Sequence, residues 1–104
     1  DPGPILNPPP APVQITRLRA RDQKPPIYPE LARRDELEGT VRLKLIVSPS
    51  GQVEEAAILK SSGHRLLDQA AQNAARLWHL YPAEFNGNPV AGWAEVEIPF
   101  RLTD

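Results

Sequence analysis

Three stretches of the chain alternate between apolar and polar residues, which is the period-two pattern of half-buried β-strands. In residues 94–102 the apolar positions are Ala94, Val96, Ile98, Phe100 and Leu102. In residues 40–48 they are Val41, Leu43, Leu45 and Val47. Residues 53–60 are also typical of a strand, but Val53, Ala56 and Ile58 share one face only if a β-bulge near residues 54–56 shifts the pattern. The pattern predicts three strands.

Two further stretches have the spacing of amphipathic helices. In residues 61–82, apolar residues recur at intervals of three and four, and Pro82 prevents continuation of the helix. These apolar residues are Leu67, Ala71, Ala74 and Trp78. A shorter helix is predicted from Pro29 to Leu37, with a first-turn proline and a glycine stop at position 39. Its candidate buried residues are Leu31, Ala32 and Leu37.

The order helix, strand, strand, helix, strand predicts the fold. Residues 49–52 have turn chemistry, so the first two strands form a hairpin, and the long helix crosses over to the third strand. We therefore predict an α+β fold: a small antiparallel three-stranded sheet with two helices on one face.

The chain before the first helix has a different composition. Six of the 13 prolines lie in the first 12 residues, which favours a stiff, solvated spacer. We predict that residues 1–23 are a proline-rich, partly basic spacer, mostly disordered, and that residues 24–104 form the folded domain. The pattern leaves open whether residues 13–21 add a strand, a helix or neither.

Charge and composition exclude several classes of function. The net charge is −1 with both signs interspersed, which argues against nucleic acid and anionic membranes as partners. The basic stretch 16–24 is either a solvated linker or a contact for an acidic partner or cell-wall polymer. The chain has no cysteine, and no apolar run approaches the ~20 residues of a membrane span. It opens on DPGP without a methionine, which is typical of a fragment of a longer protein.

Ser61, Ser62, His64 and Asp68 lie close together in the sequence and suggest a catalytic triad. A triad needs a nucleophile, a base and an orienting group that converge in a pocket with oxyanion donors. We interpret the serines instead as the start of the long helix, with His64 and Asp68 one turn apart on its surface. His79, the remaining histidine, lies too far along the chain to complete a zinc site. We predict no enzyme activity, no metal and no cofactor.

Pro99 interrupts the best strand, where a proline has no N–H to donate to a ladder. Backbone N–H and C=O groups alternate in direction along a strand. Those of Glu95, Glu97 and Pro99 therefore point to one side within the sheet, and those of the even-numbered residues point to the other side. If the even-numbered residues pair with an inner strand, the missing donor falls on the outside and the strand is an edge. The proline then either blocks this edge against aggregation or leaves it open for a partner strand.

Residues 28–102 carry a series of residues whose order and spacing are specific when taken together. They are Tyr28-Pro29, Ala32, Gly39, Val41, Val47, Gly51, Val53, Ile58, Ser61-Ser62-Gly63, Leu67-Asp68, Ala71, Trp78, Tyr81-Pro82-Ala83, Gly87, Pro89-Val90 and the last strand. In this series the sequence resembles the C-terminal domain of the TonB energy-transducer family. The resemblance implies a periplasmic energy-coupling adaptor without enzyme activity, belonging to an inner-membrane-anchored protein of a Gram-negative bacterium. Such an adaptor binds the TonB box of outer-membrane transporters by β-strand addition. It transmits force from a proton-driven ExbB/ExbD-like inner-membrane complex to drive siderophore, haem or vitamin uptake.

The resemblance also implies where the partner binds. The docking strand is Glu95, Val96, Glu97, Ile98, Pro99, Phe100, Arg101 and Leu102. A second contact is expected at Lys24, Pro25, Pro26, Ile27 and Tyr28. Trp93 is a further candidate from the residues themselves: it lies on the polar face of the last strand, where it either packs on its neighbours or contacts an incoming peptide. Family members often carry a glutamine beside a proline just ahead of the Tyr-Pro pair; here Gln23 stands earlier, and Pro25-Pro26 lies near that place.

Two alternatives stay open. The domain is either a monomer or a strand-exchanged dimer. The sequence is also compatible with a different function, in which the domain has a blocked sheet edge and serves as a structural or scaffold domain of an envelope-spanning or secretion complex.

Overall fold

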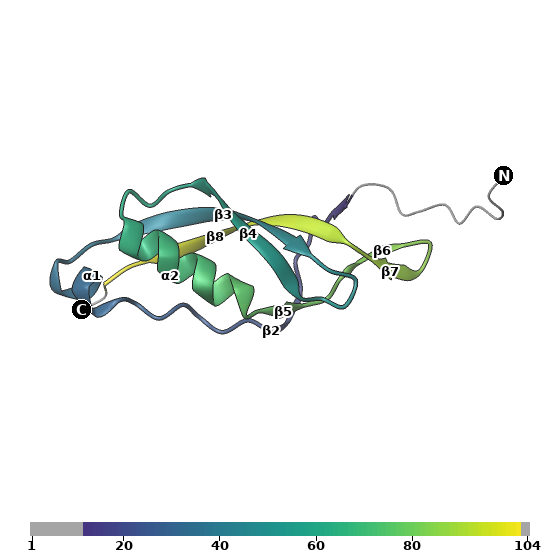
Figure 1. The fold of residues 1–104 in the computed structure, drawn as a ribbon, viewed down its shortest axis with the longest axis horizontal. Helices are drawn as coiled ribbons and strands as arrows, with labels where there is room; N and C mark the ends of the chain where they lie inside the picture. The colour runs from purple at the N-terminus through teal and green to yellow at the C-terminus, as the bar shows by residue number, and fades with distance from the viewer. Residues whose placement is uncertain (1–11, 103–104) are drawn as a thin grey trace.

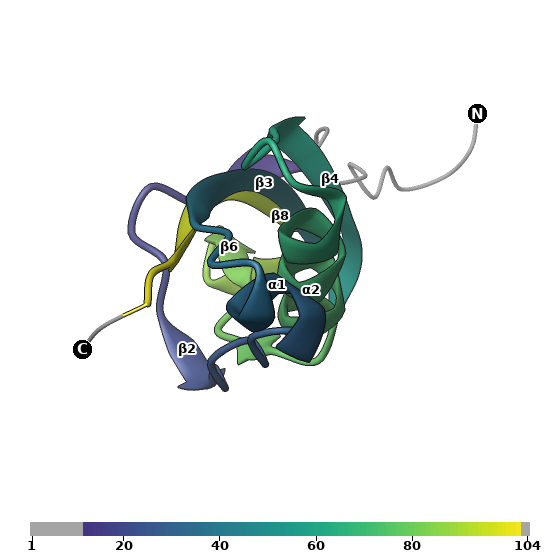
Figure 2. The same cartoon turned by 90° about the vertical axis from the view of Figure 1, so that its left-hand side faces the viewer.

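The computed structural model describes residues 12–102. The elements, in chain order, are β1 (Val13–Gln14), β2 (Ala20–Asp22), α1 (Glu30–Arg34), β3 (Gly39–Val47), β4 (Val53–Lys60), α2 (Arg65–Arg76), β5 (His79–Leu80), β6 (Ala83–Phe85), β7 (Asn88–Val90) and β8 (Gly92–Phe100). Figures 1 and 2 show the long strands arching over both helices, so α1 and α2 lie on the same face of the sheet. Within the described residues, no helix is both long and apolar enough to cross a membrane.

The main sheet corrects the predicted three-stranded antiparallel arrangement. It has four strands in the order β1-β8-β3-β4. β8 and β4 pair with β3 in antiparallel fashion, as predicted, but β1 pairs in parallel with the start of β8. Two small antiparallel pairs, β2 with β5 and β6 with β7, complete the strand pairing.

The predicted alternation in β3 is confirmed by burial. Val41, Leu43, Leu45 and Val47 are all fully buried. They form the core with Leu67, Ala71 and Ala75 of α2 and with Ile98 and Phe100 of β8. The buried alanines of α2 are small, which leaves room for the helix to pack against the larger side chains of the sheet.

The predicted bulge in β4 is also confirmed. Ile46 pairs with Glu55 and Val47 with Val53, so Glu54 is the extra residue. A second register shift lies between Arg42 and Leu43, opposite the end of β4.

The first helix is shorter than the predicted 29–37. It ends at Arg34, and Glu36 then takes a positive φ of 53°, which ends regular helical geometry. Ala32 is fully buried as predicted, and Leu37 packs partly against the core. Leu31, predicted to be buried, is 56% exposed because the short helix turns only one narrow side to the core.

The segment whose conformation the sequence left open contains two short strands. Ile15, Leu18 and Ala20 pack against the core, while Arg17, Arg19 and Arg21 are exposed. Arg19 and Arg21 both contact the ring of Tyr81, at 4.8 and 4.9 Å from its centroid. The proline-rich residues 1–11 lie outside the described part of the chain.

Candidate functional site

The outer edge of β8 is the candidate functional site, and its backbone groups have a defined direction. Ile15 N–H donates to the Trp93 carbonyl at 2.7 Å, so Trp93 directs its backbone toward β1 and away from β3. The pairing of β8 with β3 runs without a register shift from Gly92 to Phe100. Because directions alternate along a regular strand, Glu95, Glu97 and Pro99 also point outward.

Most of this edge carries no partner strand. β1 pairs only with Gly92 and Trp93. In residues 12–102, no turn, loop or side-chain hydrogen bond reaches the outward amides of Glu95 and Glu97. Pro99 adds an outward carbonyl but no N–H, as its place in the alternation predicts. Two donors and three acceptors are therefore free for a partner.

The opposite edge of the sheet is protected. The Gln72 side chain of α2 donates from Nε2 to the Ala56 carbonyl of β4 at 2.8 Å. The bulge at Glu54 also breaks the regular spacing that a partner strand needs. Of the two edges, β8 is therefore the one with consecutive, regularly spaced free groups.

The side chains beside the open edge are held on the sheet face that points away from the helices. Arg42 donates to Glu95 in an ion pair of 2.8 Å. Lys44 Nζ lies 4.9 Å from the centroid of Trp93, which is half-buried. These contacts direct the side chains along the sheet face, so the backbone of the edge stays accessible.

The predicted second contact, residues 24–28, is anchored near the end of β8. Trp78 Nε1 donates to the Lys24 carbonyl at 2.8 Å. The Tyr28 ring meets Phe100 edge-on with centroids 5.4 Å apart, and the Tyr28 hydroxyl donates to the Leu37 carbonyl. The structure thus brings this segment to the end of the docking strand, whereas Trp93 lies at the other end, beside β1.

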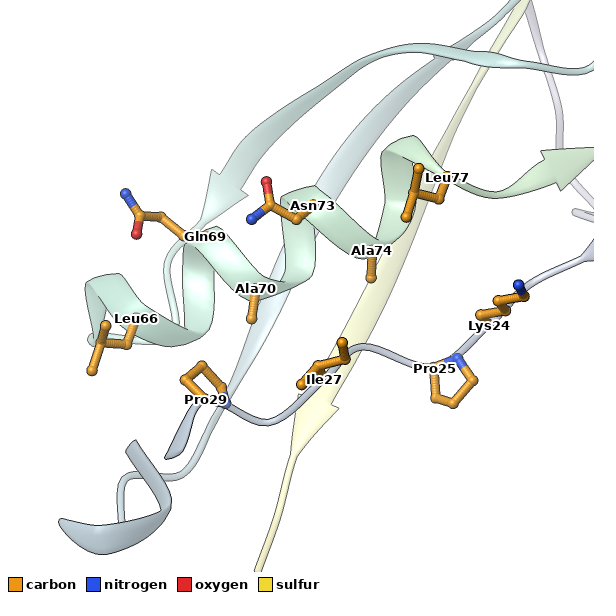
Figure 3. A pocket seen from close by; sticks show the side chains of 10 residues that line it. All are labelled: Lys24, Pro25, Ile27, Pro29, Leu66, Gln69, Ala70, Asn73, Ala74 and Leu77. Carbon is orange, nitrogen blue, oxygen red and sulfur yellow. The ribbon is translucent and has the colours of Figure 1, made fainter. Parts of the chain in front are cut away.

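A groove of about 480 Å³ separates this segment from α2. Figure 3 shows Ala70 and Ala74 on the side of α2 that faces Ile27, with Leu66 and Leu77 at the two ends. Ile27 is 85% exposed, so the segment offers an apolar side chain beside the anchored backbone.

Not every predicted docking residue lies in the strand. β8 ends at Phe100, and Arg101 and Leu102 follow it. The Leu102 amide donates to Glu38 Oε2 at 2.7 Å, which fixes the chain where it leaves the sheet. The regular part of the edge is therefore Glu95 to Phe100.

Sequence reasoning did not identify Gln72 or the contact between Trp78 and Lys24. A glutamine on a helix is ordinarily a solvated residue, and nothing in its spacing indicates that it faces the edge of β4. Nothing in the spacing of residues 24–28 indicates that the Trp78 indole binds the Lys24 carbonyl.

The residues that suggested a triad form a structural network. Asp68, predicted on the helix surface, is only 9% exposed. Its carboxylate accepts hydrogen bonds from the Ser61 hydroxyl and from the Ser62 amide and hydroxyl, at 2.9 and 2.8 Å for Ser62. α2 begins at Arg65, later than predicted, because the serines hold the turn before it. Among the described residues, no three His, Cys, Asp or Glu side chains form a metal-binding group.

Replacing Asp68 with asparagine is expected to lower the free energy of unfolding at pH 7 by about 2 kcal/mol, since hydrogen bonds to a buried carboxylate are lost. Burial raises the pKa of Asp68, but hydrogen bonds from Ser61 and Ser62 and the charge of His64 outweigh burial and hold it below the ordinary 3.8. A carboxyl group with a lower pKa in the folded state than in the unfolded state stabilises the fold at pH values above its unfolded-state pKa. This stabilisation is lost as the pH falls from the unfolded-state pKa through the folded-state pKa. Urea denaturation at pH 7 and pH 3 measures both effects.

In the asparagine variant the stability difference between the two pH values should shrink. The exposed Glu54, replaced with glutamine, is the matched control and should leave both values nearly unchanged. An Asp68→Asn variant with the pH dependence of the parent protein would contradict the assigned network.

Comparison with known proteins identifies similar sequences and a similar fold. The family model for the Gram-negative bacterial TonB protein C-terminal matches residues 24–102. Protein tonB2 of Pseudomonas aeruginosa is 44% identical over 77 residues, which cover 74% of this chain and 28% of that protein. Protein TonB of Neisseria meningitidis serogroup C is 41% identical over 86 residues, 82% of this chain and 28% of that protein.

A solved structure has the same fold. The solution NMR structure of Pseudomonas aeruginosa TonB CTD superimposes with a TM-score of 0.72 at 23% identity, covering 86% of this chain and 91% of that one. The present chain spans about 28% of the length of the two relatives above, so it corresponds to one part of such proteins.

Proposed function

Because the chain belongs to the family of Gram-negative bacterial TonB C-terminal domains, we propose that it is a periplasmic energy-coupling adaptor. It binds the TonB box of an outer-membrane transporter by adding the box as a strand beside β8. Force from a proton-driven inner-membrane complex then passes through this strand pair to the transporter and drives uptake of a siderophore, haem or vitamin.

The observation that carries the proposal is the row of unpaired outward groups on β8. Glu95 and Glu97 offer an amide and a carbonyl each, and Pro99 offers a carbonyl. In strand addition, such main-chain groups supply affinity, and side-chain pockets supply specificity. Because the opposite edge is capped by Gln72 and bulged at Glu54, a partner strand has one regular place to add.

The number of available groups fits a contact that forms and releases repeatedly. Five hydrogen bonds at a net of about 1 kcal/mol each give roughly 5 kcal/mol. Micromolar binding corresponds to about 8 kcal/mol, so an affinity of that order would need contributions beyond the ladder, such as side-chain contacts. Residues 24–28, with the exposed Ile27, are placed to supply some of these contacts at the Phe100 end.

The direct test is a two-dimensional amide NMR titration of the chain with synthetic TonB-box peptides. We expect the largest shifts at Glu95 and Glu97, with smaller shifts in residues 24–28, and slower amide hydrogen exchange at Glu95 and Glu97. The same peptides with N-methylated backbone amides are the control, because they have the same side chains but cannot form the ladder. Unchanged edge amides together with shifts on the helices would instead favour a scaffold domain with a closed edge.

A further inference from the structure

The short strand β1 occupies the start of the same edge that the proposed partner uses. Val13 N–H donates to the Ala91 carbonyl at 3.1 Å, and Ile15 N–H donates to the Trp93 carbonyl at 2.7 Å. In the sheet order β1-β8-β3-β4, β1 lies on the outer side of β8. A strand added beside Glu95 would therefore lie in line with β1 and end against it.

Close packing holds β1 in this position. A Cβ atom at Gly92 would lie 2.9 Å from the Val13 carbonyl oxygen and 3.0 Å from Ile15 Cδ1, so β1 approaches β8 where only a glycine leaves room. The Ile15 side chain also packs against the core. Displacing β1 would thus break two ladder hydrogen bonds and expose apolar surface.

The chain leaves the edge immediately after Ile15. Residues 16 and 17 form a bend, and the segment continues to β2, which pairs with β5. Glu95 is therefore the first residue of β8 whose outward amide is free. The bend marks a sharp boundary between the occupied and the open part of one edge.

We propose that β1 is a register stop: it positions the partner strand so that its ladder begins at Glu95 and extends only to Pro99. Ile15 is the positioning residue, because its amide forms the last bond before the open edge. The inference rests on the proposed strand addition. With β1 in place, the part of the TonB box that can pair with β8 is about five residues long. Partner residues beyond that length gain no ladder bonds at the β1 end.

The test compares peptide lengths on the full 104-residue chain. The probes are a five-residue TonB-box peptide and two derivatives, each extended by Val-Thr at one terminus. With the parent protein, the extension that lies toward β1 should change the dissociation constant less than about two-fold. In Ile15→Pro, which removes the amide donor, the same extension should tighten binding about five-fold, by one hydrogen bond, because the Trp93 carbonyl loses its partner in β1.

Neighbouring positions provide matched controls. Gln14 points its amide away from β8, because Val13 and Ile15 point theirs toward it. Gln14→Pro should therefore behave like the parent protein, although it introduces the same residue one position away. Ile15→Ala keeps the amide and separates loss of packing from loss of the hydrogen bond. Val13→Pro removes only the bond to Ala91 and leaves the Ile15–Trp93 bond in place, so it should keep the length dependence of the parent protein. If Ile15→Pro does not fold, the N-methylated peptides extended toward β1 test the same point on the parent protein, because they should bind no differently from the unextended N-methylated peptide.

A direct measure of register complements the affinities. A nitroxide at the β1-facing end of the five-residue peptide should broaden the amide signal of Thr16 in the parent protein. Tighter binding of the extended peptide to the parent protein, with loss of the Ile15–Trp93 bond, would overturn the proposal and show that the partner displaces β1. No length effect in any variant would also overturn it while strand addition stands. No binding of the five-residue peptide to any variant would overturn strand addition and the register stop with it.

Discussion

Replacing Gly51 with alanine is expected to lower the free energy of unfolding by about 3 to 5 kcal/mol, because two penalties add. Gly51 has φ 93°, a conformation that residues with a side chain rarely adopt. A Cβ atom there would lie 2.0 Å from the Leu80 carbonyl oxygen, which belongs to the backbone of β5. The Leu80 amide also donates to the Gly51 carbonyl at 2.8 Å, so relieving the clash breaks this bond and moves a buried leucine.

Thermal and urea unfolding followed by circular dichroism measures this effect. For a domain of this size, 3 kcal/mol corresponds to a fall in Tm of at least about 12 °C. Gly87→Ala is the matched control, since Gly87 has φ 80° but a Cβ atom added there would meet nothing within 4 Å. It should cost only the conformational penalty of about 1 to 2 kcal/mol. Equal losses for the two variants would contradict the close approach of the 48–52 turn to β5.

The central strands of the sheet could be predicted from the period of apolar residues, because the apolar residues that make this pattern are the ones that the fold buries. Val41 to Val47 alternate in sequence and are buried at every second position, and β8 follows the same rule except at the half-buried Val96. β1 could not be predicted in this way. A strand of two residues is too short for a periodic pattern to be detected. Its position also depends on the absence of a side chain at Gly92, 78 residues after Gln14.

Asp68 illustrates a different limit. A carboxylate on an amphipathic helix is expected in solvent, because burial of an unpaired charge is costly. Here three hydrogen bonds from Ser61 and Ser62 offset that cost. The serines were predicted to start the helix, but they lie in the turn before it, where they bind Asp68. The sequence could not show this, because side-chain contacts across a turn depend on the conformation of the turn.

The direction of the backbone groups in the candidate site could be predicted from the sequence. Backbone direction alternates with side-chain direction, so the position of Pro99 indicated which groups of the last strand face outward. Sequence could not decide whether that edge is open, because the answer depends on where β1 and residues 24–28 lie. Both come from distant parts of the chain.

Replacing Glu97 with proline is expected to weaken binding of a TonB-box peptide by about 10- to 100-fold. The variant removes a central outward donor and leaves a partner carbonyl without its hydrogen bond, at about 1.5 to 3 kcal/mol in total. The fold should persist, because the Glu97 amide points away from β3 and the Glu97 side chain is exposed. Fluorescence anisotropy with a labelled peptide measures the dissociation constant, and circular dichroism verifies the fold.

Two companion variants separate the backbone from the side chain. Glu97→Ala keeps the amide, so its affinity should stay within about two-fold of the parent protein. Pro99→Ala restores a donor at the end of the open edge and should tighten binding about five-fold, by one hydrogen bond. A proline added at position 97 should weaken peptide binding, and removal of the proline at position 99 should strengthen it. Only hydrogen bonds from the outward backbone groups of β8 predict these opposite effects. If Glu97→Pro binds as well as the parent protein while remaining folded, the partner does not pair with this edge, because no side-chain contact compensates for a missing central donor in a ladder of five bonds.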